Sequence, residues 1–210
     1  MSSHIIKCKS SWIKTNNNKF ITIPKTSDYG KIYEYIKNFL KIDCSIDQDV
    51  IAGYLQDWSN MKGNANLLVR PKLNKECSEI LYLSHKNNLP ITISAGRTNL
   101  TGSATPNGGI ILSTIYMDTP KIELNINAKS VSAPIGIPLE ELRNKILQLS
   151  NNSLYYPVDP TSRNDAYVGG TLSCNASGFI PGEKGATRYW TKGIEFVLPN
   201  GYYLKAMRGD

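Results

Sequence analysis

The sequence contains little histidine and no clustered cysteine, which limits the metal chemistry that it can carry. It has two histidines, His4 and His85, and four cysteines that lie far apart with no CxxC pair, at positions 8, 44, 77 and 174. Zinc sites need closely spaced cysteine and histidine ligands, so we expect no metal site. His85 is expected near the end of a helix rather than as a catalyst.

Long apolar runs and a signal peptide are also missing. No stretch approaches the roughly 20 apolar residues of a membrane-spanning helix, so no membrane span is expected. Residues 1–9 lack the basic region, the apolar stretch and the small-residue cleavage site of a signal peptide. Four cysteines could form two disulfides, but their spacing follows no disulfide framework, and we predict a reduced, cytoplasmic protein.

Positive charge is present but unevenly placed along the 210 residues. The net charge is +7, and residues 1–41 contain eight lysines against Asp28 and Glu34. A basic patch for nucleic acid could therefore lie only at the N-terminal end. Lysine outnumbers arginine 18 to 6, whereas bidentate phosphate and guanine recognition favours arginine, so nucleic acid is not an expected partner.

The N-terminal quarter predicts a hairpin followed by a helix. Residues 11–23 alternate in hydrophobicity around an Asn-Asn-Asn turn. Residues 26–41 carry apolar side chains at helical spacing, with Ser27 or Asp28 as the cap. For residues 43–65 the sequence leaves open whether a short helix or a turn forms.

A strand, a helix and a second strand follow within about 30 residues. The apolar run 67–69 ends at Pro71, Asn74 can cap a helix that ends at Asn87-Asn88, and 91–93 is the second strand. This βαβ pattern predicts parallel strands. Further elements are expected as a strand at 110–112, a strand from Val131, a helix over 138–149, a loop-rich segment to Gly185 and a hairpin over 194–204.

A loop of Gly, Thr and Asn comes directly after the second strand of this unit. Residues 95–102 read Ala-Gly-Arg-Thr-Asn-Leu-Thr-Gly, and their backbone amides could converge on phosphate oxygens. The loop lacks the Gly-Lys-Ser/Thr of a Walker A motif, and it leads into a turn and a strand rather than a Rossmann helix. Taken alone, the same residues could be an ordinary turn.

Several further motifs stand in order around this loop. They are Pro106-Asn107-Gly108-Gly109, residues 157–162 (Pro-Val-Asp-Pro-Thr-Ser), residues 168–173 (Val-Gly-Gly-Thr-Leu-Ser), residues 175–178 (Asn-Ala-Ser-Gly) and residues 193–201. From about Tyr54 to Leu204 the series resembles the FAD-binding (PCMH-type) domain of the vanillyl-alcohol-oxidase-type flavoproteins. Within them it is most similar to the FAD-linked oxidases that include glycolate oxidase subunits and D-lactate dehydrogenases.

The resemblance implies an α+β fold in two parts with FAD between them. A small parallel βαβ sheet would be followed by a mixed or antiparallel sheet, both flanked by helices. Residues 1–53 would be a Lys-rich extension with the hairpin and helix, and 54–210 would be the FAD-binding domain. The family's substrate domain, which supplies most of its substrate-binding and catalytic groups, would follow this region, so no catalytic residue is named.

The resemblance also carries over a set of cofactor-binding residues. The backbone that would hold the pyrophosphate belongs to Gly96, Arg97, Thr98, Asn99, Thr101 and Gly102. Near the nucleotide or flavin would lie Pro157, Asp159, Ser162, Gly169 and Gly170, the last two with a tight turn as the alternative. The residues that would line the flavin are Asn175, Ser177, Gly178, Gly185 and Thr187. The segment from Ile194 to Val197 would pass the adenine end.

Three departures from the family pattern affect these expectations. Arg97 stands where many relatives have glycine, and it either supplies charge to the phosphates or reshapes the loop. The sequence has no histidine after His85, so FAD is expected to be non-covalent. Cys174 falls where Asn or Thr is common, and we interpret it as a small packing residue.

The function implied is oxidation of a 2-hydroxy acid, of the D-lactate or glycolate type, by hydride transfer to FAD. The small-molecule substrate would be bound by a cap domain or a partner subunit, and the electron acceptor stays open. The alternative is a non-catalytic remnant or subunit that keeps the fold and acts only through a partner chain.

Overall fold

The computed structural model describes residues 23–209. The hairpin expected over 11–23 therefore lies almost entirely outside the described residues. Among the residues described, no helix is long and apolar enough to cross a membrane.

A four-stranded sheet forms the centre of the first half of the chain. Its strands, in the order in which they lie side by side, are β1 (Asp43–Ser45), β2 (Leu67–Arg70), β4 (Ile110–Ser113) and β3 (Ile91–Ser94). β2, β4 and β3 are parallel, and β1 is antiparallel to β2. The strands predicted at 67–69, 91–93 and 110–112 are confirmed.

β4 lies between the two strands of the predicted βαβ unit. Its Ile111 is the register partner of both Leu68 and Thr92, so β2 and β3 are parallel but not neighbours. All four residues of β4 are buried, as a central parallel strand requires. Since β3 and β4 are adjacent and parallel, residues 95–109 must return from the carboxyl edge of the sheet to its amino edge, and they do so without a helix.

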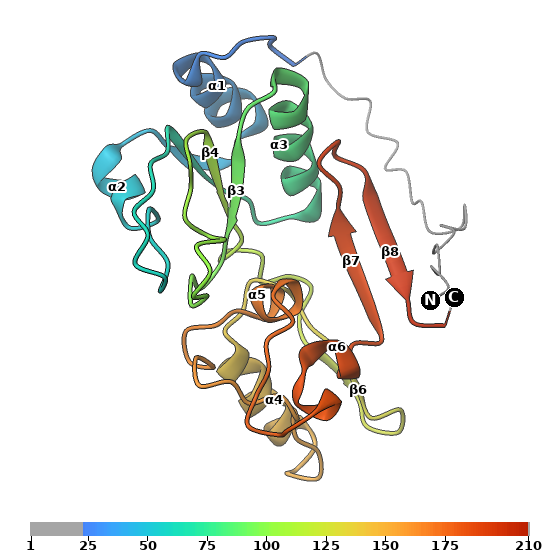
Figure 1. The fold of residues 1–210 in the computed structure, drawn as a ribbon. Helices are drawn as coiled ribbons and strands as arrows, with labels where there is room; N and C mark the ends of the chain where they lie inside the picture. The colour runs from blue at the N-terminus through green and yellow to red at the C-terminus, as the bar shows by residue number, and fades with distance from the viewer. Residues whose placement is uncertain (1–22, 210) are drawn as a thin grey trace, which may run out of the picture.

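Helices cover both faces of this sheet (Figure 1). On one face lie α1 (Tyr29–Glu34), the π-helix η2 (Tyr35–Leu40) and α3 (Asn74–Asn87), whose Ile32, Ile36 and Ile80 pack with Val69 and Leu112. On the other face lies α2 (Gln48–Ala52), whose Ile51 packs with Leu68 and Ile111. Successive strand residues thus point to opposite cores, as the two-residue period of a strand dictates.

The helix ends follow the sequence with one exception. The Asp28 carboxylate accepts hydrogen bonds from the amides of Gly30 and Lys31, which confirms it as the cap of α1. Asn74 is the first helical residue of α3, so the prediction that it caps this helix is wrong. Instead the Glu76 carboxylate reaches back to the amides of Lys72 and Leu73, at 2.6 and 3.2 Å, and satisfies the free donors there.

A second core lies around α4 (Leu139–Leu149), the predicted helix over 138–149. Leu139, Leu142 and Ile146 are buried on its inner side and pack with Ile137 and Val168. The other elements of this part are the antiparallel pair β5 (Glu123–Asn125) and β6 (Ser130–Ser132), and the short helices α5 (Val168–Ser173), η3 (Glu183–Gly185) and α6 (Thr187–Trp190). The tight turn considered for Gly169 and Gly170 is wrong, because both lie in α5.

The hairpin predicted near the end of the chain is β7 (Gly193–Val197) paired with β8 (Tyr203–Met207). It runs alongside α3 (Figure 1), so the end of the described chain returns to the first sheet unit. Its turn is attached there, because the Ser78 hydroxyl of α3 donates a hydrogen bond to the Gly201 carbonyl. The expected antiparallel sheet is thus present as two separate two-stranded ladders.

Replacing Gly201 by alanine should destabilise the fold through this attachment. Gly201 has a left-handed φ of +82°, and an added Cβ would lie 2.9 Å from both the Ser78 carbonyl oxygen and Tyr82 Cβ. The left-handed conformation alone costs about 1–2 kcal/mol for alanine, and the contacts add to it. Urea unfolding should therefore show Gly201→Ala losing at least this free energy of unfolding. Gly53→Ala is the control, since φ there is −65° and the nearest atom is 3.8 Å away; equal losses in both variants would contradict the attachment.

Candidate cofactor site

The predicted phosphate loop lies at the carboxyl edge of the parallel strands, directly after β3. Among the residues that the structure describes, six of its backbone amides have no hydrogen-bond partner, those of Gly96, Arg97, Thr98, Asn99, Leu100 and Gly102. Successive free amides in a loop with left-handed residues form concavities that bind anions. Two residues here have left-handed backbone, Arg97 at φ +56° and Gly102 at φ +74°.

The side chain of Asn99 shapes the second half of this loop. Its amide oxygen accepts hydrogen bonds from the Thr101 amide, the Thr101 hydroxyl and the Ser103 amide, at 3.1–3.2 Å. The Thr101 amide, which was expected to hold pyrophosphate, is therefore already bonded within the loop. The free amides that could bind an anion lie mostly before Thr101.

Two buried hydroxyls lie beneath the start of the loop. Ser94 and Ser113 are register partners at the carboxyl ends of β3 and β4, and both are fully buried. Neither hydroxyl has a hydrogen-bond partner within the described part of the chain. Unpaired buried hydroxyls are uncommon and typically mark a place for water or another polar group.

Asp57 anchors the end of the loop at Ala104, which lies 47 residues later in the chain. Its carboxylate is almost fully buried and accepts hydrogen bonds from the amides of Ser59, at 3.0 Å, and Ala104, at 3.2 Å. Burial alone raises the pKa of the Asp57 carboxyl, but the hydrogen bonds from Ser59 and Ala104 outweigh burial and leave the pKa below the ordinary aspartate value. The carboxylate is thus ionised and holds the loop through charge-assisted bonds.

The loop contacts the second part of the chain at Gly96. A Cβ at this position would lie 2.0 Å from the Asp165 carbonyl oxygen and 3.2 Å from the Tyr167 ring, so only glycine fits this approach. In α5, a Cβ at Gly170 would be 3.7 Å from the Ala95 side chain. The structure therefore brings the Gly96 loop and the Gly169-Gly170 helix together.

The residues predicted to lie along the flavin form a second cluster. Gly178 closely approaches the Asp159 backbone, and its amide donates to the Gly185 carbonyl. Thr187 donates to the Ala176 carbonyl, and the Asn175 side chain accepts from the Arg188 amide. Ser177 and Ala186 form an isolated bridge. This cluster is held by bonds among its own members.

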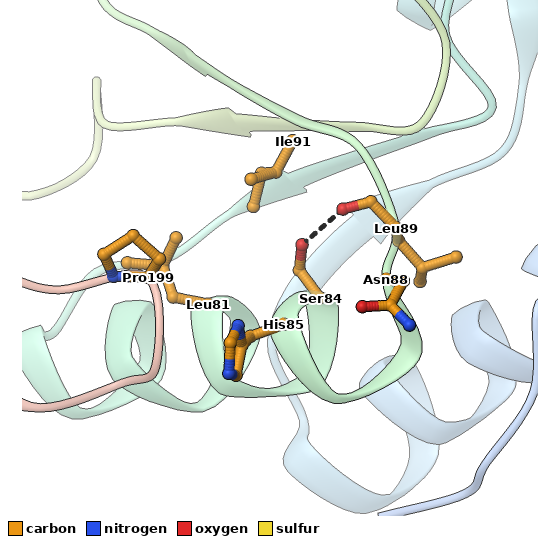
Figure 2. Close-up of a pocket in the computed structure, with 7 residues that line it drawn as sticks. All are labelled: Leu81, Ser84, His85, Asn88, Leu89, Ile91 and Pro199. Atoms are coloured by element: carbon orange, nitrogen blue, oxygen red, sulfur yellow. Dashed lines mark hydrogen bonds between the residues drawn. The ribbon is translucent and has the colours of Figure 1, made fainter.

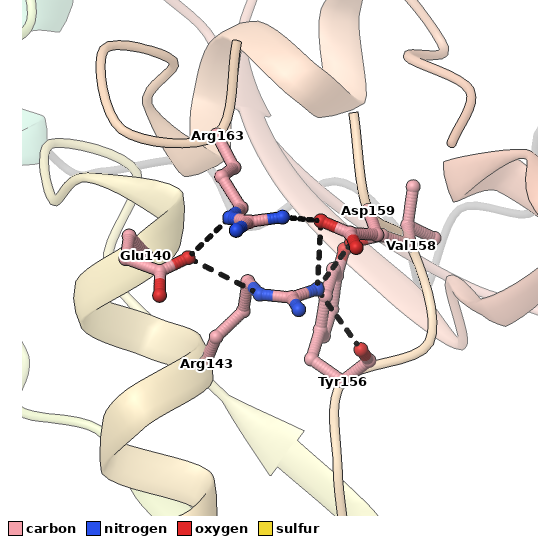
Figure 3. A network of polar contacts seen from close by, with 6 residues as sticks. All are labelled: Glu140, Arg143, Tyr156, Val158, Asp159 and Arg163. Atoms are coloured by element: carbon pink, nitrogen blue, oxygen red, sulfur yellow. Dashed lines mark hydrogen bonds and ion pairs between the residues drawn. The ribbon is translucent and has the colours of Figure 1, made fainter. Parts of the chain in front are cut away.

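Asp159 uses its carboxylate in a network of ion pairs (Figure 3). One carboxylate oxygen lies 2.7 Å from Arg163 and 3.6 Å from Arg143, and both arginines also contact Glu140 of α4, at 3.1 and 3.3 Å. Arg143 also donates to the carbonyls of Tyr156 and Val158. The negative charge of Asp159 is therefore neutralised, and its side chain serves to hold the segment 156–163 against α4.

The remaining predicted residues lie at different distances from the loop. Ser162 accepts the amides of Asp165 and Ala166 through its carbonyl, and so shapes the turn that meets Gly96. Pro157 is partly buried in the segment held by Arg143. Ile194 and Val197 lie on β7, where Val197 packs against the core between α3 and the sheet, and the structure does not bring them to the loop.

Sequence reasoning missed Tyr54, Asp57, Arg143 and Arg163. The Arg97 guanidinium lies over the Tyr54 ring, 4.8 Å from its centre. No local pattern relates Tyr54 and Asp57 to the loop, or Arg143 to Asp159, since these residues meet only through the fold. Cys174 was interpreted as a packing residue, but it is exposed at the end of α5, which corrects that interpretation.

A pocket of about 230 Å³ lies elsewhere, between the end of α3 and the β7–β8 turn (Figure 2). Its lining is mostly apolar, with His85 and Asn88 as polar members. The Ser84 hydroxyl, which also lines it, donates a hydrogen bond to the Leu89 carbonyl. Small-molecule sites typically measure about 300–1,000 Å³, and this pocket lies at the opposite edge of the sheet from the Gly96 loop. It is not part of the candidate cofactor site.

Comparison with known proteins places the chain in a family. Residues 65–206 match the family model described as FAD binding domain. The chain belongs to this family. The match covers the three parallel strands of the sheet, the Gly96 loop, the second core and nearly all of the β7–β8 hairpin, and it confirms the resemblance to the FAD-linked oxidases.

Individual relatives support the same assignment. The chain is 29% identical over 163 residues to the mitochondrial D-2-hydroxyglutarate dehydrogenase of Danio rerio, covering 77% of this chain and 30% of that protein. It is 30% identical over 142 residues to glycolate oxidase subunit GlcD of Bacillus subtilis, covering 66% and 29%. The chain thus spans about a third of the length of these relatives.

A solved structure of alkyldihydroxyacetonephosphate synthase shows the same fold. It superimposes with a TM-score of 0.72 at 20% sequence identity, over 95% of this chain and 38% of that one. The expected α+β architecture with sheets flanked by helices is confirmed.

Removing Arg143 should loosen the segment that carries Asp159. Arg143→Gln loses two carbonyl hydrogen bonds and the ion pairs to Glu140 and Asp159, and we expect about 1–3 kcal/mol less free energy of unfolding. Lys145→Gln removes one charge from the exposed side of the same helix and should change stability by less than about 0.5 kcal/mol. Urea unfolding of both variants measures the difference. Equal free energies of unfolding for Arg143→Gln and Lys145→Gln would show that the ion-pair network does not stabilise the fold.

Asp57 should make stability depend on acidity. Its pKa is lower folded than unfolded, so the ionised carboxylate stabilises the fold above the ordinary aspartate pKa of about 3.9 and loses this effect as the pH falls through the folded value. Asp57→Asn should lose about 1–3 kcal/mol at neutral pH and show a shallower decrease toward acid. Unfolding measured across this range tests it, with Asp118→Asn as an exposed-carboxylate control. Parallel curves for Asp57→Asn and the wild type would refute the assignment.

Proposed function

We propose that this chain is the FAD-binding part of a flavin-dependent oxidoreductase that oxidises a 2-hydroxy acid of the glycolate or D-lactate type. The observation that carries the proposal is the row of free amides at Gly96–Leu100, located at the carboxyl edge of a parallel sheet. The printed names of the relatives, D-2-hydroxyglutarate dehydrogenase and a glycolate oxidase subunit, favour the substrate class. When bound, FAD accepts a hydride from such a substrate.

The residues present fit a dinucleotide cofactor. The free amides of Gly96, Arg97, Thr98, Asn99 and Gly102 would hold its pyrophosphate. Beneath the loop, the buried hydroxyls of Ser94 and Ser113 are unpaired within the described part of the chain. Asp159, the acidic residue among the predicted cofactor-binding residues, is neutralised by two arginines and would not repel phosphate. The flavin side would be formed by the cluster of Asn175, Ser177, Gly178, Gly185 and Thr187, with Pro157, Ser162, Gly169 and Gly170 nearby and Ile194 and Val197 toward the adenine.

We further propose that residues 54–210 form the FAD-binding unit and that FAD is held without a covalent bond. The absence of histidine after His85 supports non-covalent binding, because it removes histidine attachment from every motif of the site. Burial raises the pKa of the Cys44 thiol to about 11 and that of Cys77 to about 12, so neither is a ready nucleophile. The three described cysteines are unpaired, which supports a reduced, cytoplasmic setting.

A second candidate is a subunit that acts through a partner chain. Large apolar side chains on the β7–β8 hairpin are exposed, with Ile194 at 40%, Phe196 at 37% and Met207 at 44%. Such a surface is typical of a region that another polypeptide covers. The substrate-binding groups would then come from outside the described residues.

Binding of FAD to the purified protein tests the proposal. FAD at a hundred times its dissociation constant should stabilise the fold by about 2.7 kcal/mol, seen as a rise in melting temperature. Acid precipitation should release the flavin into the supernatant if the bond is non-covalent. Riboflavin, which lacks phosphate, is the matched control ligand and should stabilise far less.

Two outcomes separate the candidates. No visible flavin absorbance and no thermal shift with FAD would refute a working cofactor site. FAD binding without oxidation of glycolate or D-lactate in the presence of an artificial electron acceptor would favour the subunit that needs a partner. Flavin that stays with the acid precipitate would overturn non-covalent binding alone.

A further inference from the structure

Arg97 is the only cationic residue among the predicted cofactor-binding residues, and the fold places it unusually. Its backbone is left-handed, and its carbonyl accepts the Trp58 amide at 3.1 Å, which fixes this part of the loop. Its guanidinium turns back to the Ala95 carbonyl at 3.3 Å. The positive charge therefore lies close to Ala95, where the loop with its free amides begins.

Two arginines contact Tyr54, and they differ in what balances their charge. Arg70 hydrogen-bonds the Tyr54 side chain and is paired with Asp43 at 2.8 Å. Arg97 lies over the ring face, and within the described part of the chain no carboxylate pairs with it. The contacts of Arg97 are neutral, an aromatic ring and a backbone carbonyl, so its charge is available to an anion.

Tyr54 itself is fixed in position. Its ring packs against the core of Ile51, Leu68 and Ile111 on the α2 face of the sheet. Arg70, held by Asp43, secures the side chain from a second direction. Tyr54 is therefore a rigid platform for the guanidinium, and cation–π contact orients it without neutralising it.

Resting on the proposed function, we propose that the Arg97 guanidinium binds the diphosphate of the nucleotide directly, and that Tyr54 is the residue that positions it. The ligand class is a nucleoside diphosphate, as in the ADP half of FAD. Backbone amides bind such a group whatever the side chains are, whereas a guanidinium adds a charge-assisted, bidentate contact. Of the two roles open for Arg97 from the sequence, supplying charge is the one that its unpaired guanidinium supports.

The decisive variant is Arg97→Gln, tested with FAD, ADP and riboflavin by calorimetry or flavin fluorescence. Loss of one charge-assisted contact should weaken FAD and ADP binding about 10- to 100-fold. Riboflavin, which has no phosphate, should bind as it does to the wild type. The decrease of FAD affinity with added salt should also be shallower in Arg97→Gln than in the wild type.

Lys86→Gln is the matched control. Lys86 also lies over a tyrosine ring, that of Tyr82, at 5.3 Å, but near the end of α3 at the other edge of the sheet. It removes one cation and one cation–π contact without touching the loop, so FAD affinity should stay within about twofold. A similar loss in both variants would attribute the effect to overall charge and overturn the proposal.

Variants of Tyr54 test the positioning role separately. Tyr54→Leu keeps apolar bulk on the core but removes the ring face, and it should weaken ADP binding severalfold with riboflavin unchanged. Tyr54→Phe keeps the ring and should retain most of the affinity. Equal ADP affinity of Tyr54→Leu and the wild type would refute the role of Tyr54.

Failure of this inference and failure of the proposed function have different signatures. A wild-type protein that binds neither FAD nor ADP refutes the proposed function. A wild type that binds FAD, with Arg97→Gln binding it within twofold, refutes only the role of the guanidinium. Circular dichroism verifies the folding of each variant. If Arg97→Gln does not fold, Arg97→Lys replaces it, and we expect an intermediate loss of FAD and ADP affinity. Unchanged affinity of Arg97→Lys would overturn the role of the planar guanidinium.

Discussion

The adjacency of the parallel strands β3 and β4 is the constraint on which the rest of this structure depends. Parallel neighbours cannot be joined by a tight turn, so residues 95–109 must cross from one edge of the sheet to the other. With no helix in this crossover, its backbone amides are not used by regular structure. They collect at the carboxyl edge, where Gly96 lets the second part of the chain approach and Asp57 holds the far end of the loop.

Charge at the site is arranged by pairing rather than by the overall excess of lysine. Asp159, the acidic residue among the predicted cofactor-binding residues, is bound by Arg143 and Arg163 and also holds its segment to α4. Arg97 is left with neutral partners above Tyr54. A site with its anion neutralised and one cation free suits a phosphate-bearing ligand, although the sequence beyond residue 41 is close to electrically neutral.

The two parts of the chain meet at several places that are distant in the sequence. The β7–β8 hairpin returns to α3 through Gly201 and Ser78, and the Gly96 loop meets Asp165. Relatives about three times as long share this region. The candidate cofactor site therefore depends on how the parts pack as much as on any single motif.

The sequence by itself determined the local elements: apolar runs and end signals predicted β2, α3, β3, β4 and α4, and the ordered glycine motifs identified the family. Tertiary structure alone decided that β4 lies between β2 and β3, that residues 150–193 contain short helices, and that Tyr54 and Asp57 reach the loop. The reason is physical. Hydrophobic period and turn chemistry act over a few residues, whereas strand order and the approach of Gly96 to Asp165 depend on contacts between segments distant in the sequence, as Asp57 and Ala104 are at 47 residues apart.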